Sequence, residues 1–486
     1  MIQIGIDLGT TNTVVCRARN GIYEYFQLDN NNNNMMPSVM RCSKNGVVVG
    51  INAKNAILDA PEECIYNSKV YMGTEKTWCI HEKVFTARDV AEEILKKVHN
   101  RLKEQFPGEE LVASISVPAC FTQKQIELTY DAASKSGFQI KNIVPEPVAA
   151  AKAARMNGEN AGKLFVVDIG GGTFDITAVQ NEKNEYGSVV TKCLAVGGNR
   201  NLGGNNFDEC IYDNLILPVV YKTFGKDFLQ KFTEKVLKRG QQELRAVAEK
   251  IKLHFQDAES TYCETLFDIF DDENEVDISV SYDEYLEAIS SCSTAAELAI
   301  EEVLKYIQDN YNILPDMFDN VLIVGGMARE RVIRTILTKF FEDNEIHIAS
   351  RPMSFVAEGV ARYAAERDVR IPCMLSVDIG LIAGTDRSKL GVVLFNKNTP
   401  IEQLEKQTLT ISNSEENQTK IGVAVFEQDN NSCNKLGELI IDIPPKPVGE
   451  HKIDVTLSLS QDRILQIKAV DYISDKEYET EFYVGQ

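Results

Sequence analysis

The sequence lacks any apolar run that approaches the roughly 18 residues of a membrane-spanning helix. Its N-terminus also lacks the basic stretch and apolar segment of a secretory signal, because it runs straight into an alternating strand pattern. These absences argue against a membrane partner. A cytoplasmic location is the expectation that remains.

Paired cysteine motifs are also missing. The eleven cysteines are scattered singly from Cys16 to Cys433, with no CxxC pair and no histidine at metal-ligand spacing. This pattern predicts reduced thiols in a reducing compartment.

Positive charge is scarce, with 51 Lys and Arg against 72 Asp and Glu and a net charge of −21 at pH 7. Such a surface repels phosphate backbones, which excludes nucleic acid as a general partner. Any phosphate that binds must therefore occupy a local pocket built from backbone N–H groups, which carry no formal charge.

One phrase is written twice, as "IGIDLGTTNT" at residues 4–13 and "LFVVDIGGGTFDIT" at residues 164–177. A strand that ends in Asp and turns through Gly exposes consecutive backbone N–H groups that can hold a phosphate. Asp7 and Asp168 at the strand ends then suit a magnesium ion between carboxylate and phosphate. A plain turn explains one copy equally well, but two copies with matching flanks favour a phosphate site.

Other glycine motifs refine this hypothesis. The phrase is neither the lysine-containing P-loop nor the GxGxxG dinucleotide motif. "VLIVGGMAR" at residues 321–329 reads as a buried strand, a Gly325-Gly326 turn and a helix. Close backbone packing explains that turn by itself, whereas the two phosphate phrases make it the nucleoside side of a pocket.

Strands alternate with helices through residue 365, including a helix after "TARD" that Thr86 and Asp89 cap, which predicts an α/β architecture. Beyond about residue 370 short alternating runs at 419–428, 451–460 and 464–471 replace the helical periodicity. We therefore predict a domain at 1–365, a linker at 366–374 and an all-β domain at 375–486. The third phrase, "LSVDIGLIAG", lacks the threonine and glycine run, so we interpret it as the first strand of the β domain and Asp378 as no metal ligand.

The motifs together resemble the seventy-kilodalton heat-shock chaperone (DnaK-like) family, within the actin and sugar-kinase ATPase group. The carriers are "GIDLGTTN", "VPACF", "EPVAAA", "VDIGGGTFDIT", "NLGGNNFD" and "VLIVGGMAR", followed by "NKNTPI", "SNSEENQTKIGVAVFEQ" and "LGELIIDIPPKPVG". The resemblance covers essentially the whole chain. It implies a two-lobed, actin-like α/β ATPase domain followed by an all-β sandwich that binds peptides.

The resemblance also implies site residues. Lys69 matches the lysine that reaches the γ-phosphate and attacking water, Asp7 and Asp168 match the carboxylates around hydrated magnesium, and Glu146, Thr173 and Thr10 complete the catalytic set. The implied nucleotide contacts are Gly9, Thr10, Thr11, Asn12, Gly170, Gly171, Gly172, Thr173, Gly203, Gly204, Glu249, Lys252, Gln256, Gly325, Gly326 and Arg329. On physical grounds alone Lys69, Glu249 and Lys252 could be ordinary surface charges.

The chain departs from the family pattern around the base. Gln256 and Met327 each replace a serine, Asn205 replaces an acidic residue, and Met353 replaces an aspartate. These changes predict an altered base pocket. The region after Lys69 is also much shorter than in the family.

Two further regions depart from the pattern. The family's interdomain relay runs from a proline, here Pro118, to an arginine whose position holds Ile126, which predicts rewired or weak signalling. In the β domain Ile421 falls on the central peptide pocket, Ile411 on a cleft wall, and Thr385 or Asp386 where the family has an apolar residue. Ile411 and Ile421 could equally be core strand residues. The chain stops at Gln486 without the family's helical lid, so bound peptide should exchange fast.

We therefore expect an ATP-dependent, chaperone-like protein of protein folding and the stress response that binds and hydrolyses ATP to regulate binding of extended hydrophobic peptides. The implied ligands are ATP or ADP and Mg2+, with K+ as an optional further ion. The implied partners are unfolded peptides, a J-domain co-chaperone and a nucleotide-exchange factor. The alternatives are a weakly or non-hydrolysing ATP-binding scaffold with one dedicated partner and, less favoured, a small-molecule kinase.

Overall fold

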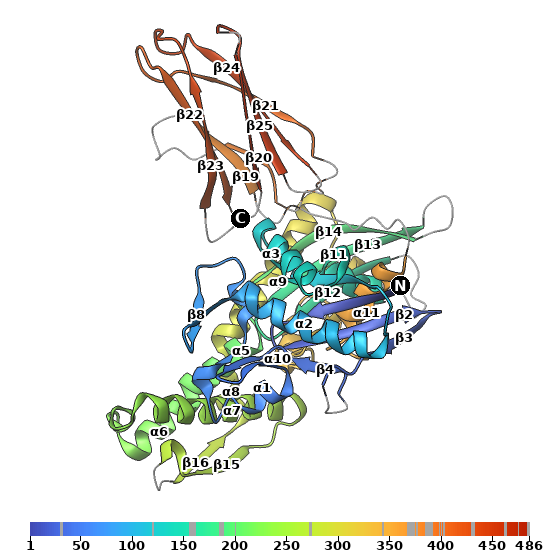
Figure 1. Cartoon of the computed structure of the whole chain (residues 1–486), viewed down its shortest axis with the longest axis vertical. Helices are drawn as coiled ribbons and strands as arrows, with labels where there is room; N and C mark the ends of the chain where they lie inside the picture. The colour runs from blue at the N-terminus through green and yellow to red at the C-terminus, as the bar shows by residue number, and fades with distance from the viewer. Residues whose placement is uncertain are drawn as a thin grey trace. The chain divides into compact units, whose positions relative to one another are not determined.

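The computed structural model describes residues 1–29, 33–118, 121–154, 162–183, 189–199, 201–271, 275–342, 345–366, 375, 378–383, 392–397, 399, 401, 404–428, 433–460, 464–474 and 476–483. Contacts divide the chain into two units, residues 1–120 with 128–370 and residues 371–486 with 121–127. Figure 1 labels the elements of both units. The predicted peptide-binding residue Thr385 and nearly all of the predicted linker lie outside the described residues.

The first unit contains two mixed sheets with the same strand pattern. In each, the first strand pairs antiparallel with the strand that follows it and parallel with a strand from later in the chain. The first sheet has the order β11-β10-β1-β2-β3, with β4 paired to β2: β1 Ile2–Leu8, β2 Asn12–Arg19, β3 Ile22–Tyr25, β4 Met35–Pro37, β10 Leu111–Val117, β11 Gln139–Pro145. The second has the order β14-β13-β12-β17-β18: β12 Gly162–Ile169, β13 Phe174–Lys183, β14 Val189–Asn199, β17 Asn320–Val324, β18 Ile346–Ile348. The repeated phrase is thus the first strand and first hairpin turn of each sheet.

Helices of this unit largely follow the sequence predictions. Helix α2 (Ala87–Gln105) has the predicted cap, because Thr86 and Asp89 form a reciprocal capping box. Strand β11 ends at Pro145 and α4 (Glu146–Ala154) begins at the next residue, so the segment "NIVPEP" is divided between a strand and a helix. Proline is tolerated in the first turn of a helix, where no N–H is needed. Glu146 therefore lies at a helix N-terminus.

Helix α11 (Phe355–Ala365) packs against both α4 and β1. A Cβ at Gly359 would overlap the carbonyl oxygen of Ala149, and one at Gly5 would overlap the backbone of Ala361. These close approaches need glycine because any side chain would separate the elements. They hold the start of the first sheet against helices from both ends of the unit.

The second sheet is covered by a large aromatic and aliphatic core that includes Phe165, Phe174 and Phe207. Helix α7 runs over Glu234–Asp257. The other helices of the unit are α1 Ile51–Asn55, α3 Gln123–Lys135, α5 Gly204–Ile211, α6 Leu217–Phe224, α8 Tyr282–Ala288, α9 Ser290–Tyr311 and α10 Arg331–Leu337, of which the first turn of α3 belongs to the second unit. The remaining strands are β5 Met40–Ser43, β6 Gly46–Val49, β7 Cys64–Ile65, β8 Thr77–Ile80, β9 Lys83–Thr86, β15 Tyr262–Phe267 and β16 Glu275–Val280.

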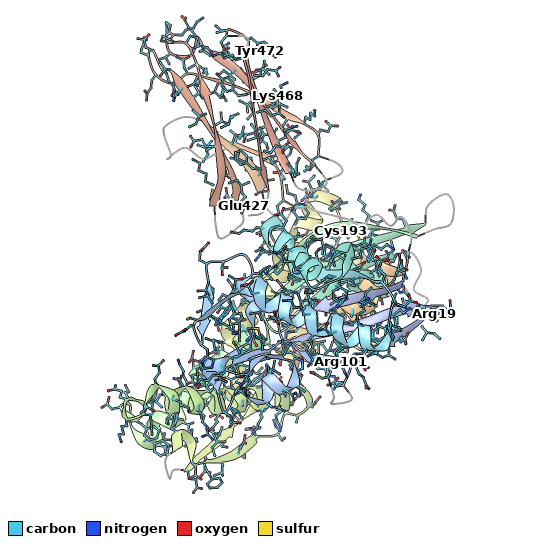
Figure 2. All side chains as sticks on the ribbon, in the orientation of Figure 1. Arg19, Arg101, Cys193, Glu427, Lys468 and Tyr472 are labelled. Carbon is cyan, nitrogen blue, oxygen red and sulfur yellow. The ribbon has the colours of Figure 1, made fainter. Side chains whose placement is uncertain are left out.

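The second unit contains two four-stranded antiparallel sheets that share one hydrophobic core. The orders are β20-β19-β22-β23 and β21-β24-β25-β26: β19 Asp378–Ala383, β20 Val392–Phe395, β21 Gln407–Ser412, β22 Lys420–Gln428, β23 Cys433–Asp442, β24 Lys452–Leu459, β25 Ile464–Asp471, β26 Lys476–Tyr483. The predicted strands at 419–428, 451–460 and 464–471 are confirmed as β22, β24 and β25. Side chains on β25 alternate between core and surface, so Lys468 faces outward and pairs with Glu477, and Tyr472 beyond the strand end is also exposed (Figure 2).

In the ranges described, no helix combines the length and apolar character that a membrane span requires.

Candidate functional site

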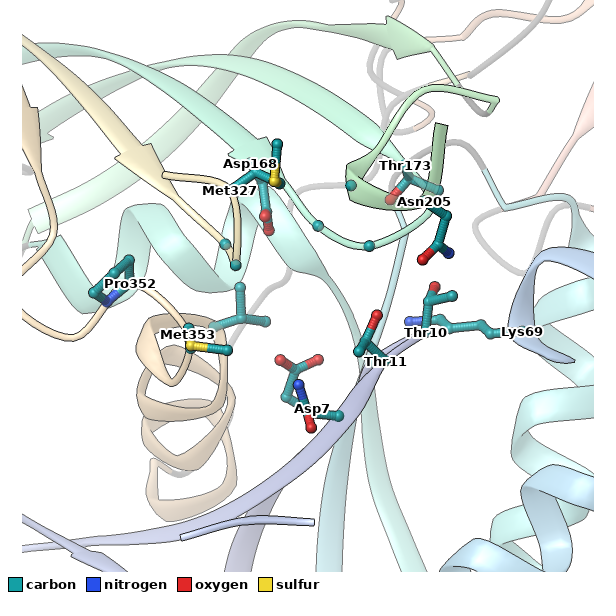
Figure 3. Close-up of a pocket in the computed structure, with 18 of the residues that line it drawn as sticks. Asp7, Thr10, Thr11, Lys69, Asp168, Thr173, Asn205, Met327, Pro352 and Met353 are labelled. Carbon is teal, nitrogen blue, oxygen red and sulfur yellow. The ribbon is translucent and has the colours of Figure 1, made fainter. Parts of the chain in front are cut away.

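A cavity of about 330 Å³ lies where the turns of the two repeated hairpins come together. Figure 3 shows Asp7 and Asp168 entering it from opposite sides, with Lys69 beside Thr10 and with Met353 and Pro352 away from that lysine. The lining residues are Asp7, Gly9, Thr10, Thr11, Asn12, Lys54, Lys69, Glu146, Asp168, Gly170, Gly171, Thr173, Gly204, Asn205, Asp208, Glu249, Lys252, Leu253, Gly325, Gly326, Met327, Pro352, Met353 and Val356.

The two hairpin turns touch. A Cβ at Gly171 would overlap Thr11 Oγ1, and a Cβ at Gly172 would come within 3.3 Å of Thr10 Cγ2. The amides of Thr10, Thr11 and Gly171 make no backbone hydrogen bond among the residues that the structure describes. Buried or cavity-facing amides seek partners, so these turns leave donors available to an anion in the cavity.

Helix α5 supports the second turn from behind. Gly204 N donates to Gly170 O at 2.9 Å, and Asn205 N donates to Gly171 O at 2.8 Å. A Cβ at Gly203 would lie 2.6 Å from Gly172 N, so this contact requires glycine. The first amides of α5 therefore hold the turn in place and are not themselves available to a ligand.

Lys69 is the central cation of the cavity. It sits on a single helical turn at residues 68–71, and its Nζ donates to Glu146 Oε1 at 2.6 Å, with both side chains nearly buried. Burial alone would lower the pKa of Lys69, but the carboxylates of Glu146 and Asp7 outweigh it and raise that pKa. The lysine therefore stays charged.

Asp7 lies at the end of β1, where Ser116 Oγ donates to its Oδ1 at 2.6 Å. The pKa of Asp7 is raised to about 6, chiefly by burial and then by Glu146, while Lys69 and Ser116 act against this rise. The serine was not predicted, because its strand lies about a hundred residues from the first phrase and nothing in "ASIS" distinguishes a core serine from a site residue.

Asp168 occupies the matching place at the end of β12. Burial raises its pKa well above the usual range, and the carboxylates of Glu146 and Asp175 raise it further. Gly325, with φ of +91°, packs so closely that a Cβ there would lie 2.6 Å from Asp168 Oδ1. The glycine of the third motif is thus required both by its left-handed backbone and by the carboxylate beside it.

The donor set fits Mg2+. Asp7, Glu146 and Asp168 surround one lysine, and burial followed by the neighbouring carboxylates raises the pKa of both aspartates. Mg2+ prefers one or two carboxylates and keeps several waters. In the described part of the chain no group of three or more His, Cys, Asp or Glu side chains forms a protein cage for a metal.

The end of the cavity away from Lys69 is apolar. Leu253, Met327, Pro352, Met353 and Val356 line it together with the Gly325-Gly326 turn. Met327 is buried, and Gln256 Nε2 contacts its Sδ at 3.4 Å. The sequence departures noted for Met327 and Met353 therefore fall on this wall.

Polar residues at the cavity edge mostly pair with each other. Lys252 Nζ lies 2.7 Å from Asp208 and donates to Gly204 O at 3.2 Å. Burial raises the pKa of Asp208 to about 6, against Lys252. Lys252 therefore ties α7 to α5.

The structure brings most of the predicted nucleotide contacts together but not all. Gly172, Gly203, Gln256 and Arg329 do not line the cavity, and Arg329 is exposed at 3.9 Å from Asp257. Five lining residues that sequence reasoning missed are Lys54, Asp208, Leu253, Pro352 and Val356. Asp208 closes the motif "NLGGNNFD", whereas no local motif marks the other four.

The predicted relay and peptide residues lie elsewhere. Pro118 follows β10 and is buried, and Ile126 is on α3, where its amide donates to Thr122 O. Ile421 is buried in the core formed by the two β-sheets of the second unit, hereafter the β unit. Ile411 is partly buried and packs against that core. Asp378 Oδ1 accepts from the amide of Lys397 at 2.6 Å, and its strand is the first of the β unit, as predicted.

Comparison with known proteins assigns the family. The family model described as Hsp70 protein matches residues 3–83 and 75–483, nearly the whole chain. The chaperone proteins DnaK of Thermotoga petrophila, Thermotoga sp. strain RQ2 and Thermotoga maritima are each 28% identical over 495 residues, covering 98% of this chain and 79% of each relative. The chain belongs to the Hsp70 family, whose members are ATPases that act as ATP-dependent chaperones.

Proposed function

We propose that this chain binds ATP in the cavity between the two repeated hairpins and hydrolyses it to regulate how its β unit holds extended hydrophobic peptide segments. The observation that carries the proposal is the meeting of both hairpin turns at one cavity with two opposed carboxylates and a buried lysine. This observation supports a two-lobed, actin-like ATPase domain at 1–365, and we assign a linker to 366–374 and a β-sandwich to 375–486.

The triphosphate is held by the hairpin turns. The free amides of Thr10, Thr11 and Gly171 suit phosphate oxygens, and Gly9, Asn12, Gly170 and Gly172 shape the turns that present them. Asp7 and Asp168 would hold Mg2+, directly or through water. A bound Mg2+ neutralises charge that develops on the phosphates during hydrolysis.

Lys69 supplies the protein's own positive charge at the reaction centre. Its salt bridge to Glu146 fixes the ammonium group, and fixed charges contribute more to catalysis than mobile ones because they need no reorganisation. The hydroxyls of Thr10 and Thr173 lie on the two turns and can orient an attacking water in line with the leaving phosphate. Glu146 also accepts hydrogen bonds at the cavity wall and can hold that water.

The nucleoside occupies the apolar end. Gly325, Gly326, Met327 and Met353 form its walls, and Glu249 and Lys252 border the ribose side, with Gly204 at the rim. Gly203 supports that rim from outside the cavity through its close contact with Gly172. Gln256 and Arg329 act from outside the cavity wall. Because the walls are methionine and glycine, the base is held by contact area more than by hydrogen bonds.

The β unit provides the peptide site. An extended segment would bind through main-chain hydrogen bonds, with Ile411 and Ile421 beneath its side chains and Thr385 at the cleft. Pro118 and the α3 position that holds Ile126 would form the relay to the ATPase domain, with rewired or weak signalling because isoleucine stands where the family has arginine. A J-domain protein and a nucleotide-exchange factor act as partners, K+ serves as a further ion, and the cytoplasm is the site of action. Family membership supports the binding of unfolded segments and co-chaperones.

Single-turnover ATP hydrolysis, with and without an unfolded peptide, tests the proposal. We expect peptide to accelerate hydrolysis and Lys69→Ala to abolish it, because the variant removes the central cation and leaves Glu146 buried without its partner. Lys83→Ala, at an exposed lysine of β9, is the matched control and should hydrolyse ATP like the parent. ATP binding without turnover in the parent would instead identify the nucleotide-binding scaffold.

A further inference from the structure

Two cysteines that are 82 residues apart in the sequence meet outside the cavity. Cys210 is the penultimate residue of α5 and Cys292 is near the start of α9, and their Sγ atoms lie 3.4 Å apart. Ser291 Oγ lies 3.5 Å from Cys210 Sγ. All cysteines in the described ranges are free thiols, and the sequence had predicted isolated ones.

The two thiols differ in access. Cys292 is 5% exposed, whereas Cys210 is partly open to solvent. Burial, together with the neighbouring Cys210, raises the pKa of Cys292 to about 12. Because Cys210 is the more exposed thiol, it is the one that reacts first with an oxidant, as the thiolate. Cys292 is the neighbouring thiol that reacts second.

We propose that Cys210 and Cys292 form a reversible redox site, in which a peroxide converts the dithiol into a disulfide that joins α5 to α9. A disulfide needs an S–S distance of about 2.05 Å, so the sulfur atoms must approach each other by about 1.4 Å. Side-chain rotation and a small helix shift can supply that movement.

The chemistry balances in two steps. The Cys210 thiolate attacks one peroxide oxygen, the O–O bond breaks, and the product is a sulfenic acid plus one water or alcohol after protonation. Cys292 then loses its proton and attacks the sulfenic sulfur, which forms the S–S bond and releases hydroxide that the proton converts to water. Two thiols are oxidised and one peroxide is reduced.

The site is linked to the cavity through α5, and this part rests on the proposed ATPase function. The first amides of α5, at Gly204 and Asn205, hold the Gly170-Gly171 turn, and Asp208 pairs with Lys252 one turn later. From Gly204 to Cys210 the helix rises only about 9 Å. A pull on Cys210 therefore shifts the amides that position the phosphate turn.

Hydrogen peroxide applied to the full chain without nucleotide tests the redox site itself. We expect loss of two hydrogens in the intact mass, a cross-linked peptide that contains Cys210 and Cys292, and full reversal by dithiothreitol. Cys292→Ser should abolish the cross-link, whereas Cys79→Ser, which removes an exposed thiol on β8, should leave it unchanged. Oxidation that consumes thiols without this cross-link would overturn the proposal.

ATP hydrolysis by the oxidised chain tests the link to the cavity. A displacement of about 1 Å in a catalytic group can slow a reaction by about 100-fold, so we expect a large loss of turnover that dithiothreitol restores. Peroxide-treated Cys292→Ser should keep its turnover. A cross-linked chain with unchanged turnover would refute the coupling but not the redox site, and a parent chain that hydrolyses no ATP would refute the proposed function alone.

Discussion

The β1–β2 and β12–β13 hairpins use one backbone device in two electrostatic settings. In each, an aspartate ends the first strand two residues before a glycine turn. Asp7 faces a hydroxyl from the parallel neighbour strand, because Ser116 follows Ile115, the partner of Ile6. Asp168 faces Val324, which has no donor side chain. Burial and Glu146 raise the pKa of Asp7 to about 6 against Lys69 and Ser116, whereas burial and the carboxylates of Glu146, Asp175 and Asp7 raise the pKa of Asp168 well above its usual range.

The comparison shows which features the two hairpins share and which differ between them. Strand order and turn geometry are shared, because both are needed to present amides at the junction. The neighbours of the carboxylates come from later strands and can change independently. Asp7 therefore ionises more readily than Asp168, and a bound cation would favour the charged form of Asp168.

Removal of either carboxylate should lower the rate of ATP hydrolysis more than the other substitutions below. We expect Asp7→Asn and Asp168→Asn each to slow ATP hydrolysis at saturating Mg2+ by about 100-fold, because each removes a charge that positions the metal and phosphates. Rapid-quench measurement of single turnovers gives the rates. Asp378→Asn, in the third phrase, is the control and should leave basal turnover unchanged. Normal turnover in Asp168→Asn would remove the metal role from the second hairpin.

The contact between the turns can be broken and repaired. Gly171→Ala places a Cβ onto Thr11 Oγ1, so we expect turnover to fall by about 10-fold as the turns are pushed apart. Thr11→Ala removes that oxygen, and the double variant should recover most of the loss. Gly170→Ala is a matched control, because its nearest neighbour for a Cβ is Thr173 O at 3.9 Å. If the double variant is as slow as Gly171→Ala, overlap with Thr11 Oγ1 is not the cause of the slower hydrolysis.

These contacts mark the limit of prediction from sequence. The glycine phrases identified both hairpins because their function lies in local backbone geometry. Ser116 and Val324 were not identified, since their importance arises only from strand pairing across a hundred or more residues. Gln256 and Arg329 were assigned to the cavity by resemblance, and neither lines it.

The fold shows the same limit. Strands with a fully alternating buried face, such as β24, were predicted within one residue at each end. Strand β21 was not predicted, because its residues alternate only between half-buried and exposed and leave a weak hydrophobic signal. The π-helical turn at residues 212–216 has no sequence signal at all.

The pKa of Asp7 predicts a pH dependence for metal binding. A carboxyl whose pKa is raised to about 6 in the folded state holds its proton longer than the unfolded chain does, so its contribution to the free energy of unfolding falls as pH rises from about 4 to about 6. Mg2+ binds the ionised form. We therefore expect MgCl2 alone to raise the melting temperature above pH 6 and to lose this effect as the pH falls through 6.

The variant Ser116→Val tests this pH dependence further, because it places a valine beside Asp7, as Val324 lies beside Asp168. Without the hydroxyl the pKa of Asp7 should rise, so the onset of Mg2+ stabilisation should move to higher pH. Differential scanning fluorimetry from pH 5 to pH 8 follows it. Ser43→Val, at a strand residue away from the cavity, is the control. An onset that stays in place in Ser116→Val would show that the hydroxyl does not set the charge of Asp7.

The smallest effect is expected where neither hairpin reaches. Met353 is 40% exposed and contributes apolar surface to the far wall of the cavity, so Met353→Ala should weaken nucleotide affinity by about five-fold through lost contact area. Turnover of bound ATP should stay unchanged, because the hairpins that hold the phosphates are intact. Titration calorimetry measures the affinity, and Met317→Ala, an exposed methionine outside the cavity, is the control. Since methionine offers no hydrogen bond that distinguishes bases, ATP and GTP should weaken by the same factor. A loss of affinity confined to ATP would mean that this wall distinguishes between bases. A loss of turnover with unchanged affinity would mean that the wall shapes the phosphate site. Either result would contradict the assignment of phosphate binding to the hairpins and of non-specific base contact to the apolar end.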